Sequence, residues 1–125
     1  MIKIDYDSGK NAVIIEVAGD VDAAQGERAL QELEKLLPSI ERGFKLLADF
    51  SAVETMEPDV EGVVIRGMDL VNANGVSEVI RVLPDPDLDL GFNMLSIFHY
   101  SRQVQFHNVR TREEAEPLLR ERIKG

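Results

Sequence analysis

Asp85, Asp87 and Asp89 alternate with other residues in one short segment, as acidic ligands do at the beginning of a calcium-binding loop. A complete loop of that kind also needs glycine at its sixth position and glutamate at its twelfth. Leu90 and Ser96 occupy these two positions. We therefore expect no metal site here, but a solvated loop whose aspartates cap the helix that follows.

The histidines of the chain, His99 and His107, have no metal-ligand motif around them. We interpret both as hydrogen-bonded structural residues. An alternative is an acid–base pair, in which folding brings a carboxylate next to His99 or His107. The sequence also lacks cysteine and the nucleophile and phosphate-loop motifs of common enzymes. The chain is therefore predicted not to be an enzyme and to need no cofactor.

The charge balance restricts the kinds of partner. The sequence has 14 lysines and arginines against 23 aspartates and glutamates, a formal net charge of −9. This charge repels nucleic-acid phosphates and anionic lipid headgroups. The basic residues between positions 110 and 124 are interleaved with glutamates, which is typical of a solvated helix face. We expect neutral or basic protein partners and no nucleic acid.

Length and composition predict one globular domain over residues 1–125, since 44% of the residues are hydrophobic. The absence of cysteine fits a reducing compartment. The first residues lack the pattern of a signal peptide, and no apolar run approaches the roughly 20 residues that span a bilayer. We therefore expect a cytoplasmic protein that does not insert into membranes.

Hydrophobic patterns predict the elements of the fold. Apolar runs and alternation predict strands at residues 2–6, 12–18, 44–49, 79–83 and 104–109. Apolar residues three or four positions apart predict helices that begin near residues 25, 60, 88 and 111, the last with an apolar stripe from Ala115 to Ile123. The order β-β-α-β-α-β-α-β-α predicts an α/β fold with about five strands and about four helices. Its small mixed sheet is expected to be mainly parallel after an antiparallel opening pair.

Turn-forming and capping residues predict where these elements end. Gly19-Asp20 is expected to end the second strand, and Pro38 to stop or bend the first helix. Thr111 and Glu114 have the spacing of a capping box at the start of the last helix. Pro117 lies beyond the first turn of that helix, which predicts either a kink or a later start.

The segment from residue 88 to 100 is richer in large apolar side chains than one buried helix face requires. Leu95 and Phe98 are predicted to face inward, with Phe92 as a third candidate. We favour the interpretation that the whole surplus belongs to the core. The alternative is that Met94 and Ile97 form an exposed patch for a partner, a second copy of the chain or a lipid chain.

The junction Met56–Gly62 follows the third strand and precedes the second helix. Ligand and partner sites of α/β sheets favour the carboxyl ends of strands. Pro58 suits the first position of a helix, and Glu57, Asp59 and Glu61 place negative charge where the helix dipole favours it. An ordinary helix start would show the same residues, so the junction alone does not indicate a function.

Three segments resemble motifs of the STAS domain, the fold of bacterial anti-sigma-factor antagonists and of the cytoplasmic tails of sulfate transporters. They are Gly19-Asp20-Val21-Asp22, Leu47-Ala48-Asp49-Phe50-Ser51-Ala52-Val53 and Gly62-Val63-Val64. The predicted order of elements agrees with that family over essentially the whole chain. The resemblance implies a regulatory domain that binds a protein, such as an anti-sigma factor, a serine kinase or another signalling protein.

The sequence departs from the family at the phosphorylation motif. Antagonists carry D-S-S-G there, and this chain has Glu57-Pro58-Asp59-Val60. The position of the phosphorylated serine falls on Asp59. A serine kinase can phosphorylate neither Pro58 nor Asp59, so the resemblance implies the fold and the partner surface without this switch.

These observations predict a non-enzymatic regulatory protein-interaction domain. A homodimer is left open as a further arrangement. The alternative function is a binding module for a small apolar or lipid-like ligand near Phe92–Tyr100. The predicted partner-binding residues are Gly19, Asp20, Asp22, Met56, Glu57, Pro58, Asp59, Glu61 and Gly62.

Overall fold

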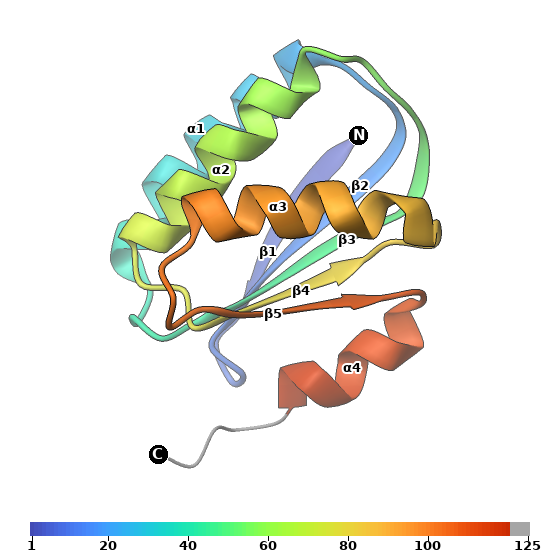
Figure 1. Ribbon diagram of the computed structural model, residues 1–125. Coiled ribbons are helices and arrows are strands. Elements are labelled where there is room, and N and C mark those ends of the chain that lie inside the picture. The colour runs from blue at the N-terminus through green and yellow to red at the C-terminus, as the bar shows by residue number, and fades with distance from the viewer. Residues whose placement is uncertain (121–125) are drawn as a thin grey trace.

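Within residues 1–120, which the computed structural model describes, five strands form one mixed sheet and four α-helices pack against it (Figure 1). The strands are β1 (Ile2–Asp7), β2 (Ala12–Val21), β3 (Lys45–Met56), β4 (Glu78–Val82) and β5 (Gln105–Val109). The α-helices are α1 (Ala23–Leu36), α2 (Val60–Ala73), α3 (Asp89–His99) and α4 (Arg112–Arg120). Two 3₁₀ turns, η1 and η2, span Leu37–Ser39 and Pro86–Leu88.

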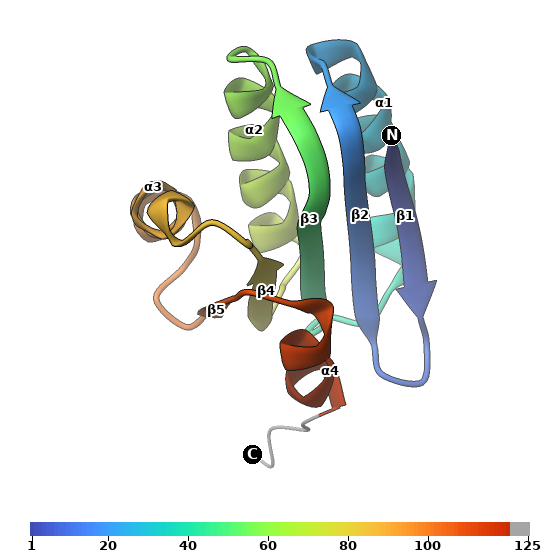
Figure 2. The same cartoon turned by 90° about the vertical axis from the view of Figure 1, so that its right-hand side faces the viewer.

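The strands lie side by side in the order in which they follow one another along the chain. β1 and β2 form an antiparallel hairpin, and the other neighbouring pairs are parallel. This arrangement confirms the predicted α/β fold and its mainly parallel mixed sheet. Because each right-handed crossover advances the chain by one strand in the same direction, α1, α2 and α3 all cover one face. Helix α4 covers the opposite face (Figure 2).

Both faces of the sheet are covered by helices, which explains why the central strands are apolar without alternation. Successive residues of β3 point to opposite faces. Leu46 therefore packs in the larger core with Leu33 of α1, and Leu47 packs in the smaller core with Ala115 of α4. All four of these residues are buried.

The second and third strands are longer than predicted. Gly19-Asp20 was expected to end β2, and Asp49 to end β3, but the strands continue to Val21 and Met56. Past Asp49, β3 no longer pairs with β4, and its extension pairs with that of β2 instead. The register shifts beside Gly19, whose positive φ of 73° suits glycine at such an irregularity. The extension is largely exposed, so backbone pairing maintains it without an apolar pattern that a sequence could reveal.

The predicted helix ends are largely confirmed. The first α-helix ends just before Pro38, which lies in η1. Thr111 Oγ1 accepts a hydrogen bond from the Glu114 backbone at 3.2 Å, and the Thr111 backbone donates to Glu114 Oε1 at 3.1 Å, so the capping box is confirmed. Pro117 lies inside α4, so the later start is wrong. Ile123 lies outside the described residues.

Asp49 ties α4 to the sheet. Its Oδ2 accepts a hydrogen bond from Arg112 Nη1 at 3.2 Å, and its Oδ1 accepts bonds from the Ser51 backbone and hydroxyl at 2.9 and 2.6 Å. Burial by itself raises the pKa of the Asp49 carboxyl, but the bonds from Ser51 and Arg112 outweigh burial. The pKa therefore lies below its ordinary value.

We expect the substitution Asp49→Asn to lower the free energy of unfolding by about 1–2 kcal/mol at neutral pH. Because the pKa of Asp49 is lower in the folded state, the carboxylate stabilises the protein above its unfolded-state pKa, and this stability is lost as pH falls through the folded-state pKa. Urea unfolding at a series of pH values should show the difference between the two proteins shrinking in acid. Ser51→Ala, which keeps Arg112, should give a smaller effect of the same sign. A difference that does not change with pH would contradict this account.

Candidate functional site

The two predicted partner-binding segments lie at the same end of the sheet. Thr55 Oγ1 donates a hydrogen bond to Asp20 Oδ1 at 2.6 Å, and the Glu57 backbone donates to the Val21 carbonyl at 3.0 Å. These bonds join the end of β2 to the end of β3. The structure therefore brings together Gly19–Asp22 and the Met56–Gly62 junction, which are far apart in the sequence.

Asp22 has a structural partner of its own. It is the N-cap of α1, and its Oδ1 accepts a hydrogen bond from the Gln25 backbone at 2.9 Å. The amino group of Met1 in turn donates to Gln25 Oε1 at 3.2 Å. Helix capping therefore explains the presence of Asp22 without any contact to a partner protein.

The junction is an exposed turn that leads into α2. The Val60 backbone donates to the Glu57 carbonyl at 3.0 Å, and α2 begins at Val60. Pro58 therefore lies ahead of the helix, and its predicted place as the first helical residue is wrong. The Asp59 side chain is exposed and makes no capping hydrogen bond, whereas Glu61 lies in the first helical turn as predicted.

The surplus of apolar residues on α3 is not a core face. Phe92 and Leu95 pack against the core as predicted, but Phe98 is 78% exposed, so its inward assignment is wrong. The residue that faces the sheet is the buried Ser96, whose Oγ accepts a hydrogen bond from Arg81 Nη1 at 2.6 Å. Phe98 is two residues further along the helix, a rotation of about 200°, and therefore points to solvent. Because Ser96, the buried residue of α3, is polar, the apolar pattern of the sequence did not predict this orientation of the helix.

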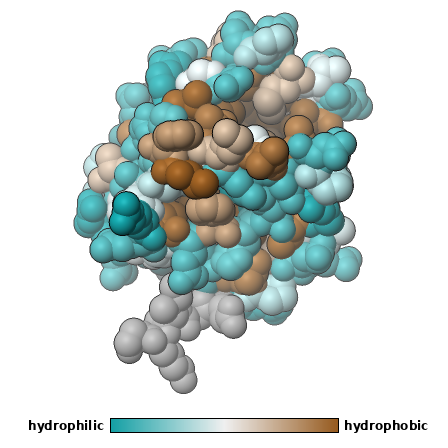
Figure 3. All heavy atoms as spheres, in the orientation of Figure 1, coloured by the Kyte–Doolittle hydropathy of each residue, from teal (hydrophilic) through white to brown (hydrophobic). Residues whose placement is uncertain are grey.

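An exposed apolar surface results, which we call the α3 patch. Figure 3 shows apolar residues gathered over α3. Met94 and Ile97 belong to the patch, so the exposure that the alternative predicted for them is confirmed, whereas their role in binding stays a prediction. Exposed apolar surface of this kind marks interaction sites. The members of the α3 patch are Leu88, Leu90, Met94, Ile97 and Phe98.

A groove of about 560 Å³ separates the junction from α3, and we call it the α2–α3 groove. Met56, Pro58 and Val64 line one side of it. Leu95 and Phe98 line the other side. Two features that the sequence offered separately, the junction and the apolar stretch, are therefore two walls of one site.

The α2–α3 groove has an acidic lining as well as an apolar one. Glu57 and Glu61 contribute carboxylates from the side of the junction, and Asp87 contributes one from the side of α3. Within the part of the chain that the structure describes, none of these three carboxylates forms a salt bridge. Their charge is therefore available to a bound partner.

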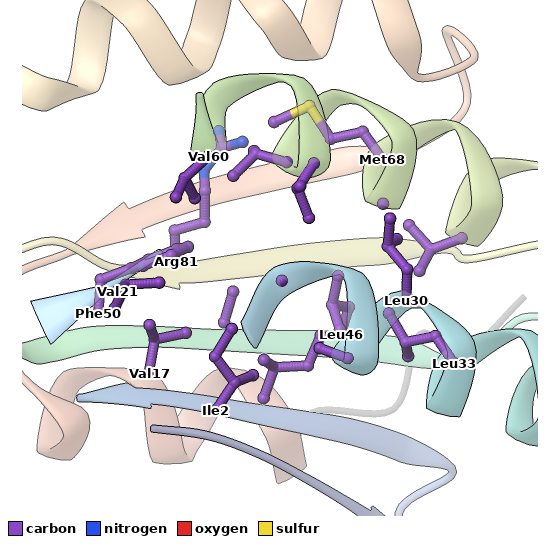
Figure 4. Close-up of a pocket in the computed structure, with 18 of the residues that line it drawn as sticks. Ile2, Val17, Val21, Leu30, Leu33, Leu46, Phe50, Val60, Met68 and Arg81 are labelled. Carbon is purple, nitrogen blue, oxygen red and sulfur yellow. The ribbon is translucent and has the colours of Figure 1, made fainter. Parts of the chain in front are cut away.

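A second hollow, the interior cavity, lies between the sheet and helices α1 and α2 (Figure 4). Its volume is about 120 Å³. Val17, Leu46 and Met68 are typical of its apolar lining, and Arg81 of β4 also lines it. Sequence reasoning missed Arg81, although a charged residue inside the apolar strand at residues 79–83 is a visible signal of a special position.

The histidines lie on opposite faces of the sheet. His99 Nδ1 is 2.8 Å from Asp69 Oδ1 at the end of α3, and His107 Nε2 is 2.8 Å from Glu78 Oε2 on the face of α4. Both are hydrogen-bonded, as predicted. Folding thus brings a carboxylate next to each histidine, as the acid–base alternative requires, but neither histidine lines the groove or the interior cavity.

Two of the three aspartates of the η2 loop, Asp85 and Asp89, have side-chain partners among residues 1–120. Asp85 Oδ1 accepts a hydrogen bond from the Asp87 backbone at 2.9 Å and caps η2. The N-cap of α3 is Leu88, which makes no capping hydrogen bond, so the prediction that an aspartate caps this helix is wrong. Asp89 accepts two bonds from Arg110, at 2.8 and 2.7 Å. Among residues 1–120, no group of three or more histidines, aspartates or glutamates is placed to hold a metal ion. No helix in the same range is long and apolar enough to cross a membrane.

Comparison of the sequence with known proteins finds no matching family model and no matching curated protein. Solved structures do match over nearly the whole chain. An uncharacterized DUF3478-family protein with a SpoIIAA-like fold, from Shewanella loihica PV-4, is 13% identical and has a TM-score of 0.71, and the match covers 95% of this chain and 92% of that one.

Two regulatory proteins match as well. The Bacillus cell-fate determinant SpoIIAA in its phosphorylated form is 17% identical, with a TM-score of 0.67 and coverage of 96% of this chain and 100% of that one. An anti-sigma factor antagonist from Mycobacterium paratuberculosis is 15% identical, with a TM-score of 0.61 and coverage of 97% and 94%. The chain therefore has the STAS-like fold of SpoIIAA and other anti-sigma factor antagonists.

Proposed function

We propose that this domain is a non-enzymatic, cytoplasmic regulatory module that binds a signalling protein in the α2–α3 groove. One observation carries the proposal: Leu88, Met94 and Phe98 of the α3 patch face the Met56–Gly62 junction across an acidic groove. The contact surface extends over Gly19–Asp22, which lies beside the junction. An anti-sigma factor or a serine kinase is the kind of partner that the fold suggests.

The charge of the groove favours a basic partner. Glu57, Glu61 and Asp87 surround an apolar floor, so a complementary surface presents apolar side chains flanked by lysine or arginine. A second copy of this chain would bring the same carboxylates to a symmetric interface, where like charges repel. A different protein is therefore favoured over a homodimer.

The proposed module binds without the serine switch. Asp59 stands where the phosphorylated serine of the antagonists falls, and its exposed side chain carries one permanent charge. A phosphoserine carries more charge and three acceptor oxygens, so Asp59 reproduces it only in part. The neighbouring Thr55 hydroxyl donates a hydrogen bond to Asp20, so this hydroxyl already has a partner within the domain.

A photo-crosslinking amino acid in place of Phe98, introduced in the native host, tests this function. It should capture one signalling protein that the same amino acid in place of Glu32, exposed on α1, does not capture. With that protein purified, calorimetry should show that Phe98→Asp and Glu61→Lys weaken binding about tenfold or more. Burial of the Phe98 ring and attraction by the Glu61 carboxylate are the physical reasons.

Glu32→Lys is the matched control, because it makes the same charge change on an exposed helical residue outside the groove. It should change the affinity by less than about twofold. Equal capture from positions 98 and 32 would contradict the proposal. An affinity unaffected by Phe98→Asp would contradict it equally.

A second candidate function is the binding of a small apolar ligand, and the interior cavity favours it. Met56, Val64 and Phe92 line both this cavity and the α2–α3 groove, so the two hollows adjoin. An apolar hollow of this kind can hold a small molecule, as engineered apolar cavities do. Native mass spectrometry of protein purified without detergent would reveal such a ligand.

A further inference from the structure

Arg81 is the single charged residue among the described residues that line the interior cavity. Its side chain is almost fully buried, at 2% exposure. Figure 4 shows Arg81 extending from β4 toward Val60, where α2 begins. Its neighbour in the register of β3 is Ala48, which also lines the cavity and whose small side chain leaves space beside the arginine.

The acceptors that the described part of the chain offers to the Arg81 guanidinium are all neutral. Nε donates to Asn108 Oδ1 at 2.8 Å, Nη1 to Ser96 Oγ at 2.6 Å, and Nη2 to Asn93 Oδ1 at 3.3 Å. The ring of Phe92 lies 5.3 Å from the guanidinium carbon. A guanidinium has five N–H donors, and these hydrogen bonds use three of them.

Among residues 1–120, no carboxylate forms a salt bridge with the buried charge of Arg81. Burial of a cation without an anion destabilises the folded state, because water no longer solvates the charge. Asp89 acts on Arg81 only through its electric field, because both its oxygens are bonded to Arg110. Burial lowers the pKa of Arg81 to about 10, so the side chain stays a cation at neutral pH.

We propose that the interior cavity binds a small amphiphile, whose carboxylate pairs with Arg81 and whose apolar chain fills the hollow. The proposal rests on the second candidate function and specifies the class of its ligand. A carboxylate matches the planar fork of a guanidinium, and the pair gains strength where water is excluded. The cavity volume of about 120 Å³ suits a chain of about six carbons, since a cavity of about 150 Å³ holds benzene.

Hexanoate and its neutral isostere hexanamide are the probes that test this site. By isotope-edited NMR titration, hexanoate should bind the intact protein about tenfold more tightly than hexanamide, and should shift the Arg81 Nε–H signal. Arg81→Met should bind both probes equally, because methionine keeps the apolar volume and removes the charge. Ala48→Leu should weaken both probes, because its side chain occupies the space beside Arg81.

The outcomes distinguish the claim that Arg81 binds an anion from the claim that the cavity binds a small ligand. Equal binding of hexanoate and hexanamide by the wild-type protein would overturn the anion site and leave the cavity as an apolar site. A preference for hexanoate that persists in Arg81→Met would overturn it as well. Binding of neither probe would overturn the small-ligand function itself. Should Arg81→Met fail to fold, the Nε–H signal of the wild-type protein decides: no shift with hexanoate overturns the assignment.

Discussion

The substitution Glu78→Ala is expected to lower the free energy of unfolding by about 3–5 kcal/mol. Glu78 and Lys45 are both buried, with exposed fractions of 5% and 7%, and Lys45 Nζ lies 3.2 Å from Glu78 Oε1. The other carboxylate oxygen lies 2.8 Å from His107 Nε2. Without Glu78, the Lys45 ammonium keeps the Leu118 carbonyl but loses a buried carboxylate whose Oε1 lies 3.2 Å away.

Urea unfolding of both proteins measures this loss. Glu27→Ala is the matched control, because Glu27 pairs with Arg66 on the surface, where both side chains are about half exposed. Water solvates such an exposed pair, so the control should lose no more than about 1 kcal/mol. Similar losses for Glu78→Ala and Glu27→Ala would show that burial does not set the strength of the Lys45–Glu78 pair.

The substitution Gly26→Val is expected to lower the free energy of unfolding by about 2–3 kcal/mol. Gly26 lies where α1 crosses α2, and a Cβ atom there would be 2.7 Å from Val63 Cγ1. The Val63 side chain is short and branched, so it has no flexible end that could move away from the new Cβ atom. The two helices would have to separate, and the apolar contacts between them would weaken.

Gly62→Ala is the control for a helical glycine with free space. A Cβ atom at Gly62 would meet nothing within 4 Å, so alanine should raise the stability by about 0.5–1 kcal/mol through its helix propensity. Thermal unfolding of both variants gives the comparison. A second substitution, Val63→Ala, should recover part of the loss in Gly26→Val. No recovery would show that the crowding lies elsewhere.

The stabilities of Gly26→Val and Gly62→Ala also help to test the proposed partner-binding surface. Gly62 belongs to the predicted partner-binding residues, and the space around it means that alanine changes the surface without changing the fold. A loss of partner binding in a stable Gly62→Ala protein would therefore report contact at this position. The same loss in Gly26→Val would report only on the packing of α1 against α2.

The sequence by itself determined the class of the fold and the order of its elements. Apolar runs and helical spacing are local patterns, and each element buries its apolar side chains wherever it packs, so these patterns predict strands and helices before the topology is known. The capping box of Thr111 and Glu114 is local in the same way. The correspondence of Asp59 with the phosphorylated serine rests on neighbouring residues of the sequence alone and stays a prediction.

Tertiary structure alone decided which residues form a site. The extensions of β2 and β3 pair with each other and bury only a few apolar residues, such as Val21 and Val53. Neither segment has a regular apolar pattern that predicts this pairing. Phe98 points outward because Arg81 holds Ser96 on the buried face of α3. The α2–α3 groove and the charge beside the interior cavity arise where segments distant in sequence meet. Such contacts depend on the geometry between elements, whereas local patterns specify only the elements themselves.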